Sequence, residues 1–288
     1  MNATPAAPRA ALDPRVLAAT TDALGIDPVR VLHSTASTNE DLVHQVASGS
    51  AAHLSVLTCE HQTGGKGRLG RGWQVPEGAA LTVSIAVNPD PALPVPALSW
   101  YTMLAALAWC RAIGNHTALS GRIKWPNDVL IGSHKVCGIL AQLATGPRGA
   151  AVVVGTGLNV DQDRTELPVA TATSLRLAGG MPVDRSELLA GYVAAFHRLD
   201  ASFRAVSGDA SAPLAGAGGS SLRDLVSGKL ATLGQLVRID YPDGSSLEAR
   251  ALDLAADGAL EVRDDTGTIH RVLAGDVHHV RRSDGHYA

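Results

Sequence analysis

Aromatic residues and long hydrophobic runs are scarce in this sequence. Phenylalanine, tryptophan and tyrosine make up 3% of the 288 residues, which leaves too few flat side chains to stack the bases of single-stranded nucleic acid. The longest apolar run, residues 103–110 (MLAALAWC), is far too short to cross a bilayer. The first residues (MNATPAAPRAALDP) contain no apolar signal-peptide core. We therefore expect a cytoplasmic protein that neither enters a membrane nor is secreted.

Cysteine is also rare, and its spacing carries no metal or disulfide signature. Cys59, Cys110 and Cys137 are odd in number and widely separated, with no C-x-x-C motif, so we expect reduced thiols. The adjacent pair His278 and His279 is only a weak metal signal, because neighbouring residues on a strand point in opposite directions. The net charge of -3 argues against nonspecific nucleic-acid binding by the whole surface.

Lysine is the third scarce residue. Of the 24 basic residues, four are lysines, namely Lys66, Lys124, Lys135 and Lys229. Three of these four fall in the motifs described below. An otherwise arginine-rich sequence that keeps lysine at such positions indicates sites that need a compact, rotatable ammonium group.

The order of the periodic segments predicts two domains. Residues 1–28 read as a disordered tail and one helix that ends at Gly25, which leaves no room for a helix-turn-helix domain. Residues 29–228 contain strands and helices, and a linker rich in Gly, Ala and Ser at 207–221 marks a loop. Residues 229–288 contain short alternating runs separated by turn signals, which predict a small antiparallel barrel or meander.

A glycine-rich basic segment, GGKGRLGRGW at residues 64–73, satisfies the dinucleotide-binding pattern G-x-G-x-x-G. That pattern requires a helix to begin at its last glycine. Here Gly72, Pro76 and Gly78 break any helix, and residues 81–87 (LTVSIAV) return to a strand. The segment therefore predicts a loop between two strands, whose cations hold an anion other than a dinucleotide.

Four further motifs each allow a structural and a functional interpretation. KWPNDV (124–129) is typical of a hairpin corner, and Lys135 is typical of the solvated start of a strand. The glycines of GTGLNV (155–160) indicate a bulge or a close backbone approach. Ser37 and Glu40 have the spacing of a helix capping box, although a helix N-terminus also offers donors to a polar ligand.

Taken together, these segments resemble the biotin protein ligases, the ATP-dependent enzymes that attach biotin to carboxylase carrier domains. The matching motifs, in the family's order, are STN (37–39), EHQTGGKGRLGRGW (60–73), KWPNDV, HKVCGIL (134–140) and GTGLNV. The resemblance implies an α+β fold, with a mixed, mainly antiparallel sheet flanked by helices and a small C-terminal Src-homology-3-like β-barrel. Two residues depart from the family pattern: Lys66 replaces a usual arginine, and Cys137 stands where alanine is frequent.

The resemblance also implies a reaction in two steps that needs ATP and Mg²⁺, with biotin as substrate. Biotin is activated to biotinyl-AMP with release of pyrophosphate, and a lysine of the carrier domain then displaces AMP. Because a carboxylate must approach a triphosphate, fixed cations are expected, and Lys135 and Arg68 are the catalytic candidates. The expected biotin contacts are Ser37, Thr38, Asn39, Gln62, Lys66, Gly67, Arg68, Lys135 and Gly138. The expected ATP contacts are Arg68, Arg71, Trp73, Lys124, Trp125, Asn127, Asp128, Lys135 and Asn159, with Asp128 as the candidate Mg²⁺ contact.

Three alternatives accompany this interpretation. A lipoate ligase or octanoyl transferase shares the catalytic fold, but KWPND together with GKGRLGR favours biotin. An RNA-binding protein is disfavoured by the lack of aromatic residues. A ligase that also represses transcription would need a DNA-binding domain, so we expect no DNA partner, and the sequence leaves a homodimer open.

Overall fold

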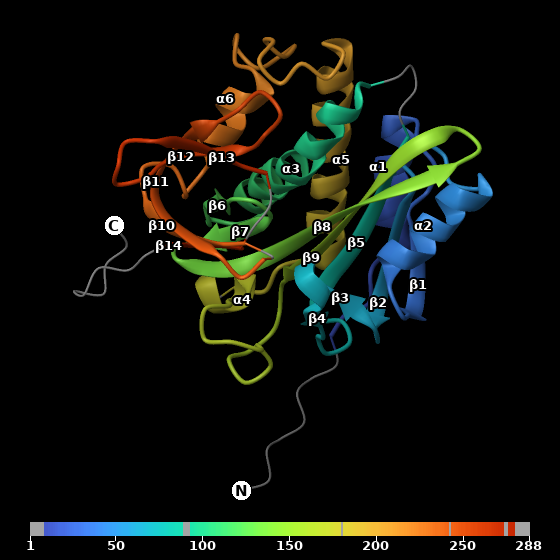
Figure 1. The fold of residues 1–288 in the computed structure, drawn as a ribbon. Helices are drawn as coiled ribbons and strands as arrows, with labels where there is room; N and C mark the ends of the chain where they lie inside the picture. Colours follow the sequence, from blue (N-terminus) through green and yellow to red (C-terminus); the bar gives the residue numbers. More distant parts are fainter. Residues whose placement is uncertain (1–8, 89–92, 180, 242, 274–275, 280–288) are drawn as a thin grey trace, which may run out of the picture.

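A seven-stranded sheet forms the centre of the larger domain (Figure 1). The computed structural model describes residues 9–88, 93–179, 181–241, 243–273 and 276–279. In spatial order the strands are β1 (Arg30–Thr35), β2 (Val56–Gln62), β5 (Ala80–Val87), β9 (Gly149–Asn159), β8 (His134–Gly146), β7 (Asp128–Ile131) and β6 (Gly121–Lys124). The β1–β2 pair is parallel and the other neighbouring pairs are antiparallel. The prediction of a mixed, mainly antiparallel sheet is confirmed.

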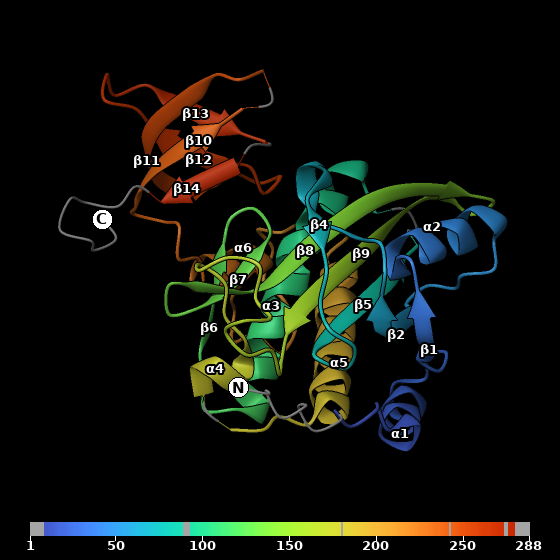
Figure 2. The same cartoon turned by 90° about the horizontal axis from the view of Figure 1, so that it is seen from below.

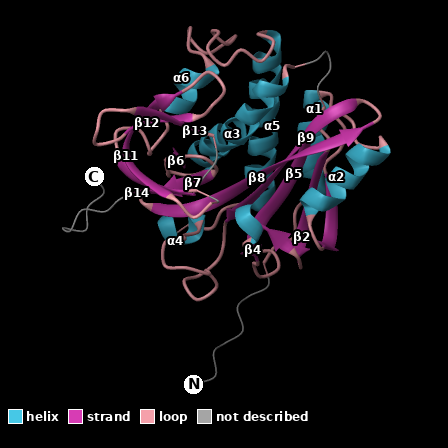
Figure 3. Ribbon diagram, viewed as in Figure 1, coloured by secondary structure: helices cyan, strands magenta, loops and turns pink. Residues whose placement is uncertain are grey.

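Helix α2 (Thr38–Ser48) joins the parallel pair and covers one face of the sheet (Figure 3). It begins at the N-cap Ser37 and ends at Gly49, whose φ of 79° is in the left-handed region that glycine adopts at no steric cost. Leu42 and Val46 of this helix pack against Val153 in a small separate core. This packing fixes the N-terminus of α2 over the sheet.

The opposite face is covered by α3 (Trp100–His116) and α5 (Arg185–Ala205), with α1 (Pro14–Leu24) packed against α5. Helix α3 is buried on almost all sides because it lies between the sheet and α5. Trp109 of α3 stacks on Tyr192 of α5, with ring centroids 3.9 Å apart. The main core therefore lies on the side of the sheet away from α2.

The C-terminal part forms a five-stranded antiparallel sheet beside the larger domain (Figure 2). Its strands are β10 (Leu236–Asp240), β11 (Ser246–Leu254), β12 (Leu260–Arg263), β13 (Ile269–Val272) and β14 (Asp276–His279), in the spatial order β13-β12-β11-β10-β14. The turns contain Gly244, Gly258 and Gly267, each with a positive φ. The predicted small antiparallel domain is confirmed.

The two domains share one hydrophobic core and a hydrogen-bonded junction. Three successive carbonyls of the β11–β12 turn accept side-chain hydrogen bonds from the larger domain. Trp100 Nε1 donates to Ala256 O (2.8 Å), Ser99 Oγ to Asp257 O (2.7 Å) and Trp125 Nε1 to Gly258 O (3.0 Å). The expected boundary lies between residues 228 and 229. Just past it, Lys229 O accepts a hydrogen bond from Ile123 N of β6, so this segment is still attached to the large sheet.

The N-terminal segment is attached to the larger domain before α1 begins. Residues 1–8 of the expected disordered tail lie outside the described residues, but Arg9 pairs with Asp161 (2.9 Å) and Glu166 (2.6 Å). The expected disorder therefore does not extend to Arg9. The helix that was expected to end at Gly25 is α1, as predicted.

Several short elements were not predicted. They are α4 (Leu175–Gly179), α6 (Leu222–Ser227), the 3-10 helix η1 (Arg68–Gly70) and the two-residue strands β3 (Gly65–Lys66) and β4 (Gly72–Trp73). A second 3-10 helix, η2 (Val95–Ser99), leads directly into α3. Helix α6 follows the Gly, Ala and Ser-rich linker and begins with a capping box between Ser221 and Asp224. That pair is visible in the sequence and was missed.

Within the described residues, no helix is both long and apolar enough to span a membrane. The cysteines at 59, 110 and 137 are unpaired and buried, and burial raises the pKa of each thiol, to about 12 for Cys110. The same part of the chain contains no group of three or more potential metal-ligating His, Cys, Asp or Glu side chains.

Candidate active site

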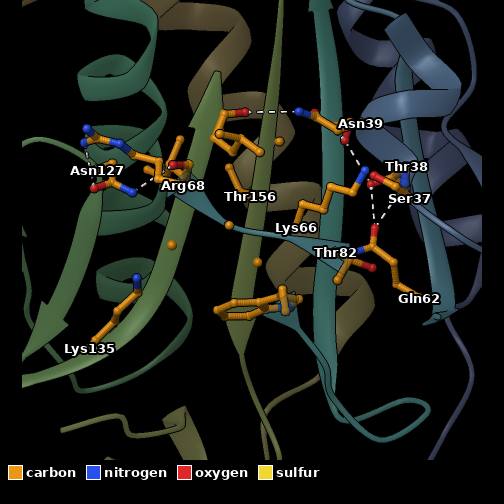
Figure 4. Close-up of a pocket in the computed structure, with 18 residues that line it drawn as sticks. Ser37, Thr38, Asn39, Gln62, Lys66, Arg68, Thr82, Asn127, Lys135 and Thr156 are labelled. Carbon is orange, nitrogen blue, oxygen red and sulfur yellow. Dashed lines mark hydrogen bonds between the residues drawn. The ribbon is translucent and has the colours of Figure 1, made fainter. Parts of the chain in front are cut away.

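One pocket opens where the N-terminus of α2, the glycine-rich segment and strands β5, β9 and β8 meet (Figure 4). It contains about 520 Å³ of empty space, part of it open to solvent. Its lining residues are Ser37, Thr38, Asn39, Gln62, Lys66, Gly67, Arg68, Trp73, Thr82, Ser84, Asn127, Lys135, Gly138, Ile139, Leu140, Gly155, Thr156 and Gly157. All nine residues expected to contact biotin are among them.

The N-terminus of α2 supplies one polar wall of the pocket. Ser37 accepts a hydrogen bond from Glu40 N, so it is the helix cap that the sequence predicted. Gln62 Oε1 accepts from Thr38 N (3.0 Å) and from Thr38 Oγ1 (3.3 Å). These side chains are almost fully buried. The segment therefore both caps helix α2 and lines the pocket.

Strand β5 adds two hydroxyl groups that the sequence analysis missed. Thr82 and Ser84 both line the pocket, and Ser84 Oγ lies 2.9 Å from Thr38 Oγ1 and 3.0 Å from Asn39 Oδ1. A signal was available, since two hydroxyls alternate with apolar residues in LTVSIAV and residues two apart on a strand share a face.

Glycines on β9 form the floor and allow side chains to lie close to the sheet. A Cβ at Gly155 would overlap the amide of Asn39, and a Cβ at Gly157 would overlap the indole of Trp73. The neighbouring strands pair Gly157 with Gly138 across the ladder. The sequence-based expectation of a close backbone approach at GTGLNV is therefore correct.

The glycine-rich segment is a short antiparallel hairpin of β3 and β4 closed by η1. Gly67 N donates to Arg71 O across it (2.6 Å). Lys66 Nζ is paired with Glu40 of α2, which ties the hairpin to the helix. Gly65 leaves the space in which Gln62 and Trp73 meet the hairpin backbone. No helix follows, as the sequence analysis expected.

Lys135 reaches the pocket because of an irregularity in β8. The ladder between β7 and β8 shifts register between Val129 and Leu130, which leaves Val136 as an extra residue. The Lys135 side chain lies over Gly138, and its Nζ is 2.6 Å from Asp128 Oδ1. On its other side, Lys135 N donates to Thr171 O (2.9 Å). The lysine is therefore held between β7 and the segment that follows β9.

Arg68 of the hairpin meets the turn of KWPNDV. Arg68 Nη1 lies 3.4 Å from Asn127 Oδ1, and Asn127 Nδ2 donates to Ile139 O (3.0 Å). Arg68 and Asn127, like Lys135, lie on the side of the pocket away from Gln62 (Figure 4). The pocket thus has a hydrogen-bonding side, where Lys66 is paired with Glu40, and a second side that contains Lys135 and Arg68.

Five of the nine residues expected to contact ATP do not line this pocket. They are Arg71, Lys124, Trp125, Asp128 and Asn159. Trp125 and Asn159 are buried, with Trp125 bonded to Gly258 O and Asn159 Nδ2 to Thr173 O (2.9 Å). Asp128 is paired with Lys135. Trp125 and Asn159 therefore each have a structural role in this fold.

The sequence and the fold are similar to those of known proteins. The Biotin/lipoate A/B protein ligase family matches residues 31–159, and the Biotin protein ligase C terminal domain matches residues 232–280. The Biotin--[acetyl-CoA-carboxylase] ligase of Mycobacterium tuberculosis is 34% identical over 254 residues, which are 87% of this chain and 88% of that protein. The Bifunctional ligase/repressor BirA of Escherichia coli is 34% identical over 167 residues, 56% of this chain and 50% of its own length.

Among solved structures, the biotin protein ligase from Aquifex aeolicus in complex with biotin and ATP superposes with a TM-score of 0.70 at 25% identity. The match covers 87% of this chain and 97% of that one. The shared fold therefore extends over most of both chains. This chain belongs to the biotin protein ligase family.

Proposed function

We propose that this protein is an ATP-dependent biotin protein ligase, which forms biotinyl-5'-AMP and transfers biotin to a lysine of a biotin carboxyl carrier domain. One observation carries the proposal: a single pocket combines buried neutral hydrogen-bonding groups with three cations, of which Lys66 is paired with Glu40. The hydrogen-bonding side contains Thr38 and Gln62, and the second, cationic side contains Lys135 and Arg68. Family membership and the ATP and biotin bound by the Aquifex aeolicus relative support the same reaction.

The hydrogen-bonding side fits the head group of biotin. The ureido ring has two N–H donors and one carbonyl acceptor, and the proposed contacts are Ser37, Thr38, Asn39 and Gln62. A site with buried polar groups rejects a ligand that leaves them unpaired. The dithiolane ring of lipoate has no N–H or carbonyl. This chemistry disfavours a lipoate ligase or octanoyl transferase.

The cationic side fits the activation step. A carboxylate oxygen of biotin attacks the α-phosphorus of ATP, the bond to the bridging oxygen breaks, and pyrophosphate leaves. Lys135 and Arg68 would neutralise the carboxylate and the phosphoryl oxygens as these two groups approach each other. This neutralisation lowers the activation barrier because the charge is greatest in the transition state. The ion pair with Asp128 and the backbone bond to Thr171 hold Lys135 in place for this role.

The transfer step uses a different nucleophile from the activation step, but the same oxygens must be stabilised in both steps. The amine of the carrier lysine attacks the acyl carbon of biotinyl-AMP, the acyl–oxygen bond breaks, AMP leaves, and the amine loses a proton. An amide bond forms on the carrier. Neither step requires a covalent bond to the enzyme.

ATP would occupy the cationic side and extend past it. The proposed ATP contacts are Arg68, Arg71, Trp73, Lys124, Trp125, Asn127, Asp128, Lys135 and Asn159. Mg²⁺ bound with ATP supplies charge neutralisation of the phosphates. Asp128 fits such an ion as a single carboxylate, because Mg²⁺ is commonly held by substrate phosphates and one or two carboxylates.

The proposal extends to location and organisation. We place the protein in the cytoplasm, where its three free thiols are expected to stay reduced. The proposal includes no DNA partner. It keeps the division at residues 28/29 and at 228/229, with residues 229–231 as a link that is hydrogen-bonded to β6 of the larger domain. A homodimer is tested by measuring the mass of the protein in solution.

Pyrophosphate release tests the function directly. The protein is incubated with ATP, Mg²⁺ and either biotin or lipoate, and then with a biotin carboxyl carrier domain. We expect pyrophosphate with biotin and a mass increase of the carrier by one biotinyl group. Release with lipoate alone would overturn the proposal.

A further inference from the structure

The side chain of Asn39 lies across the floor of the pocket and contacts strands β5 and β8 on its two sides. Its side chain is 6% exposed, and the missing Cβ of Gly155 on β9 leaves the space in which its amide lies. On one side, Asn39 Oδ1 is 3.0 Å from Ser84 Oγ of β5. On the other, Asn39 Nδ2 reaches β8, 3.2 Å from Leu140 O and 2.5 Å from Gln142 Oε1.

Simple chemistry fixes the direction of this amide. A backbone carbonyl can only accept a hydrogen bond, so the group that faces Leu140 O must be the NH₂ group. Both of its protons are then used, one by Leu140 O and one by Gln142 Oε1. The oxygen of Asn39 consequently lies on the side of Ser84, another lining residue, whose hydroxyl donates to it, and the second lone pair of this oxygen is the acceptor that the amide can offer to a ligand.

Gln142 is placed to enforce that direction. It is two residues beyond Leu140 on β8, so its side chain projects from the same face as Gly138 and Leu140 of the lining. Its bond to Asn39 is shorter than the bond that Leu140 O accepts. Gln142 itself does not line the pocket, so any effect on a ligand passes through Asn39.

We propose that Gln142 is a positioning residue that makes the pocket select ligands with a ring N–H, by holding the Asn39 amide with its oxygen toward the ligand. The inference rests on the proposed function, in which that ligand is the ureido ring of biotin. Without Gln142, one buried donor of Asn39 loses its partner, and only the longer bond to Leu140 O (3.2 Å) still holds the amide in this orientation. The acceptor for the ring N–H is then lost for part of the time.

The experiment compares variants of the full-length protein by pyrophosphate release at varied biotin and varied ATP. For Gln142→Leu we expect the KM for biotin to rise about 3- to 10-fold, the range for one hydrogen bond, with kcat and the KM for ATP within about twofold of wild type. Gln142→Glu keeps an acceptor facing Nδ2, and we expect it to restore the KM. The matched control is Gln45→Leu, because Gln45 bonds the exposed Arg30 and does not line the pocket.

A double-mutant cycle with Asn39→Ala tests the route of the effect. If Gln142 acts through Asn39, adding Gln142→Leu to Asn39→Ala raises the KM for biotin no further. Additive effects would overturn the proposal, as would an unchanged KM in Gln142→Leu or a parallel rise in the KM for ATP. Thermal unfolding of each variant identifies any that fails to fold, in which case Gln142→Met provides the same comparison.

Measurements on the wild-type protein distinguish a failure of this proposal from a failure of the proposed function. If wild type releases pyrophosphate with biotin but Gln142→Leu behaves like wild type, the positioning role alone is wrong. If wild type releases none with biotin, the proposed function fails and the positioning proposal fails with it.

Discussion

Lys135 and Gly138 lie on the same face of β8, although three residues apart on a regular strand would place them on opposite faces. The extra residue Val136 inverts the alternation between them. Val136 and Cys137 are consequently both fully buried, while Lys135 points over Gly138 into the pocket. Bulges often re-aim a side chain beside an active site in this way.

Replacing Lys135 with alanine should abolish adenylation. Because the ammonium acts mainly where charge develops, we expect kcat for pyrophosphate release to fall by roughly two to three orders of magnitude. ATP binding, measured by calorimetry, should weaken far less. Lys135→Arg is the matched variant that retains the charge. A near wild-type rate in Lys135→Ala would make Lys135 a structural partner of Asp128 only.

The glycine-rich hairpin should become protected from trypsin when the intermediate forms. Lys66, Arg68 and Arg71 are cleavage sites for trypsin, and the glycines around them lose much backbone entropy on ordering. We expect cleavage between residues 66 and 71 in the free protein and strong protection with biotin plus ATP, since biotinyl-AMP supplies the phosphate that the cations hold. ATP alone is the control and should protect little. Equal cleavage in all conditions would rule out closure over the intermediate.

Trp125 should couple the C-terminal domain to the ATP side of the site. Trp125→Phe removes the donor to Gly258 O and leaves that carbonyl without its donor, at a cost of about 1–3 kcal/mol in the free energy of unfolding. Because Trp125 adjoins Asn127, we also expect a higher KM for ATP. Trp100→Phe breaks the analogous bond to Ala256 O outside KWPNDV and should lower stability without changing that KM. Equal KM values in both variants would contradict the coupling.

Deleting residues 235–288 should impair biotin transfer. The junction carbonyls and part of the shared core leave with the C-terminal domain. The remaining domain would expose apolar surface, so excision should also lower its solubility. Transfer to a carrier domain at the wild-type rate by this truncated protein would show that the domain is dispensable.

Asp200 should make stability depend on pH. It is 2% exposed, and although burial alone raises its pKa, the hydrogen bond and charge of His53 and the charge of Arg204 lower it below the ordinary 3.8. A lowered folded-state pKa gives stability that is complete above the unfolded pKa and is lost as pH falls through the folded one. We therefore expect the free energy of unfolding to decrease when the pH is lowered below about 4.

Denaturant titrations between pH 7 and pH 3 measure this effect. Asp200→Asn should lower stability at pH 7 by about 1–3 kcal/mol, because it removes the negative charge that faces the partly buried Arg204. It should also flatten the dependence on pH. Asp22→Asn, at an exposed position on α1, is the control and should keep the wild-type profile. A wild-type profile in Asp200→Asn would contradict the assignment.

The sequence by itself determined the local elements and the motifs of the site. Helix α2 was predicted from Ser37 and an apolar period, and the C-terminal strands from alternation and glycine turns, because caps, periodicity and turns depend on neighbouring residues. The nine expected biotin contacts, which all line one pocket, came from the resemblance of these short motifs to those of a known family and not from residue patterns alone. Alternation in β5 would also have revealed Thr82 and Ser84.

Only the tertiary structure decided what these segments meet. The bulge at Val136, the carbonyl that Trp125 contacts, and the bond between Asn39 and Gln142 each depend on strand register or on domain packing. Gln142 could not be identified as a functional residue from the sequence. A single glutamine on a strand forms no recognisable pattern until the residue that its side chain contacts is known. Propensity and periodicity act over a few residues, whereas the contacts of Trp125 and Asn39 join positions 133 and 103 residues apart, and the burial of a common core brings them together.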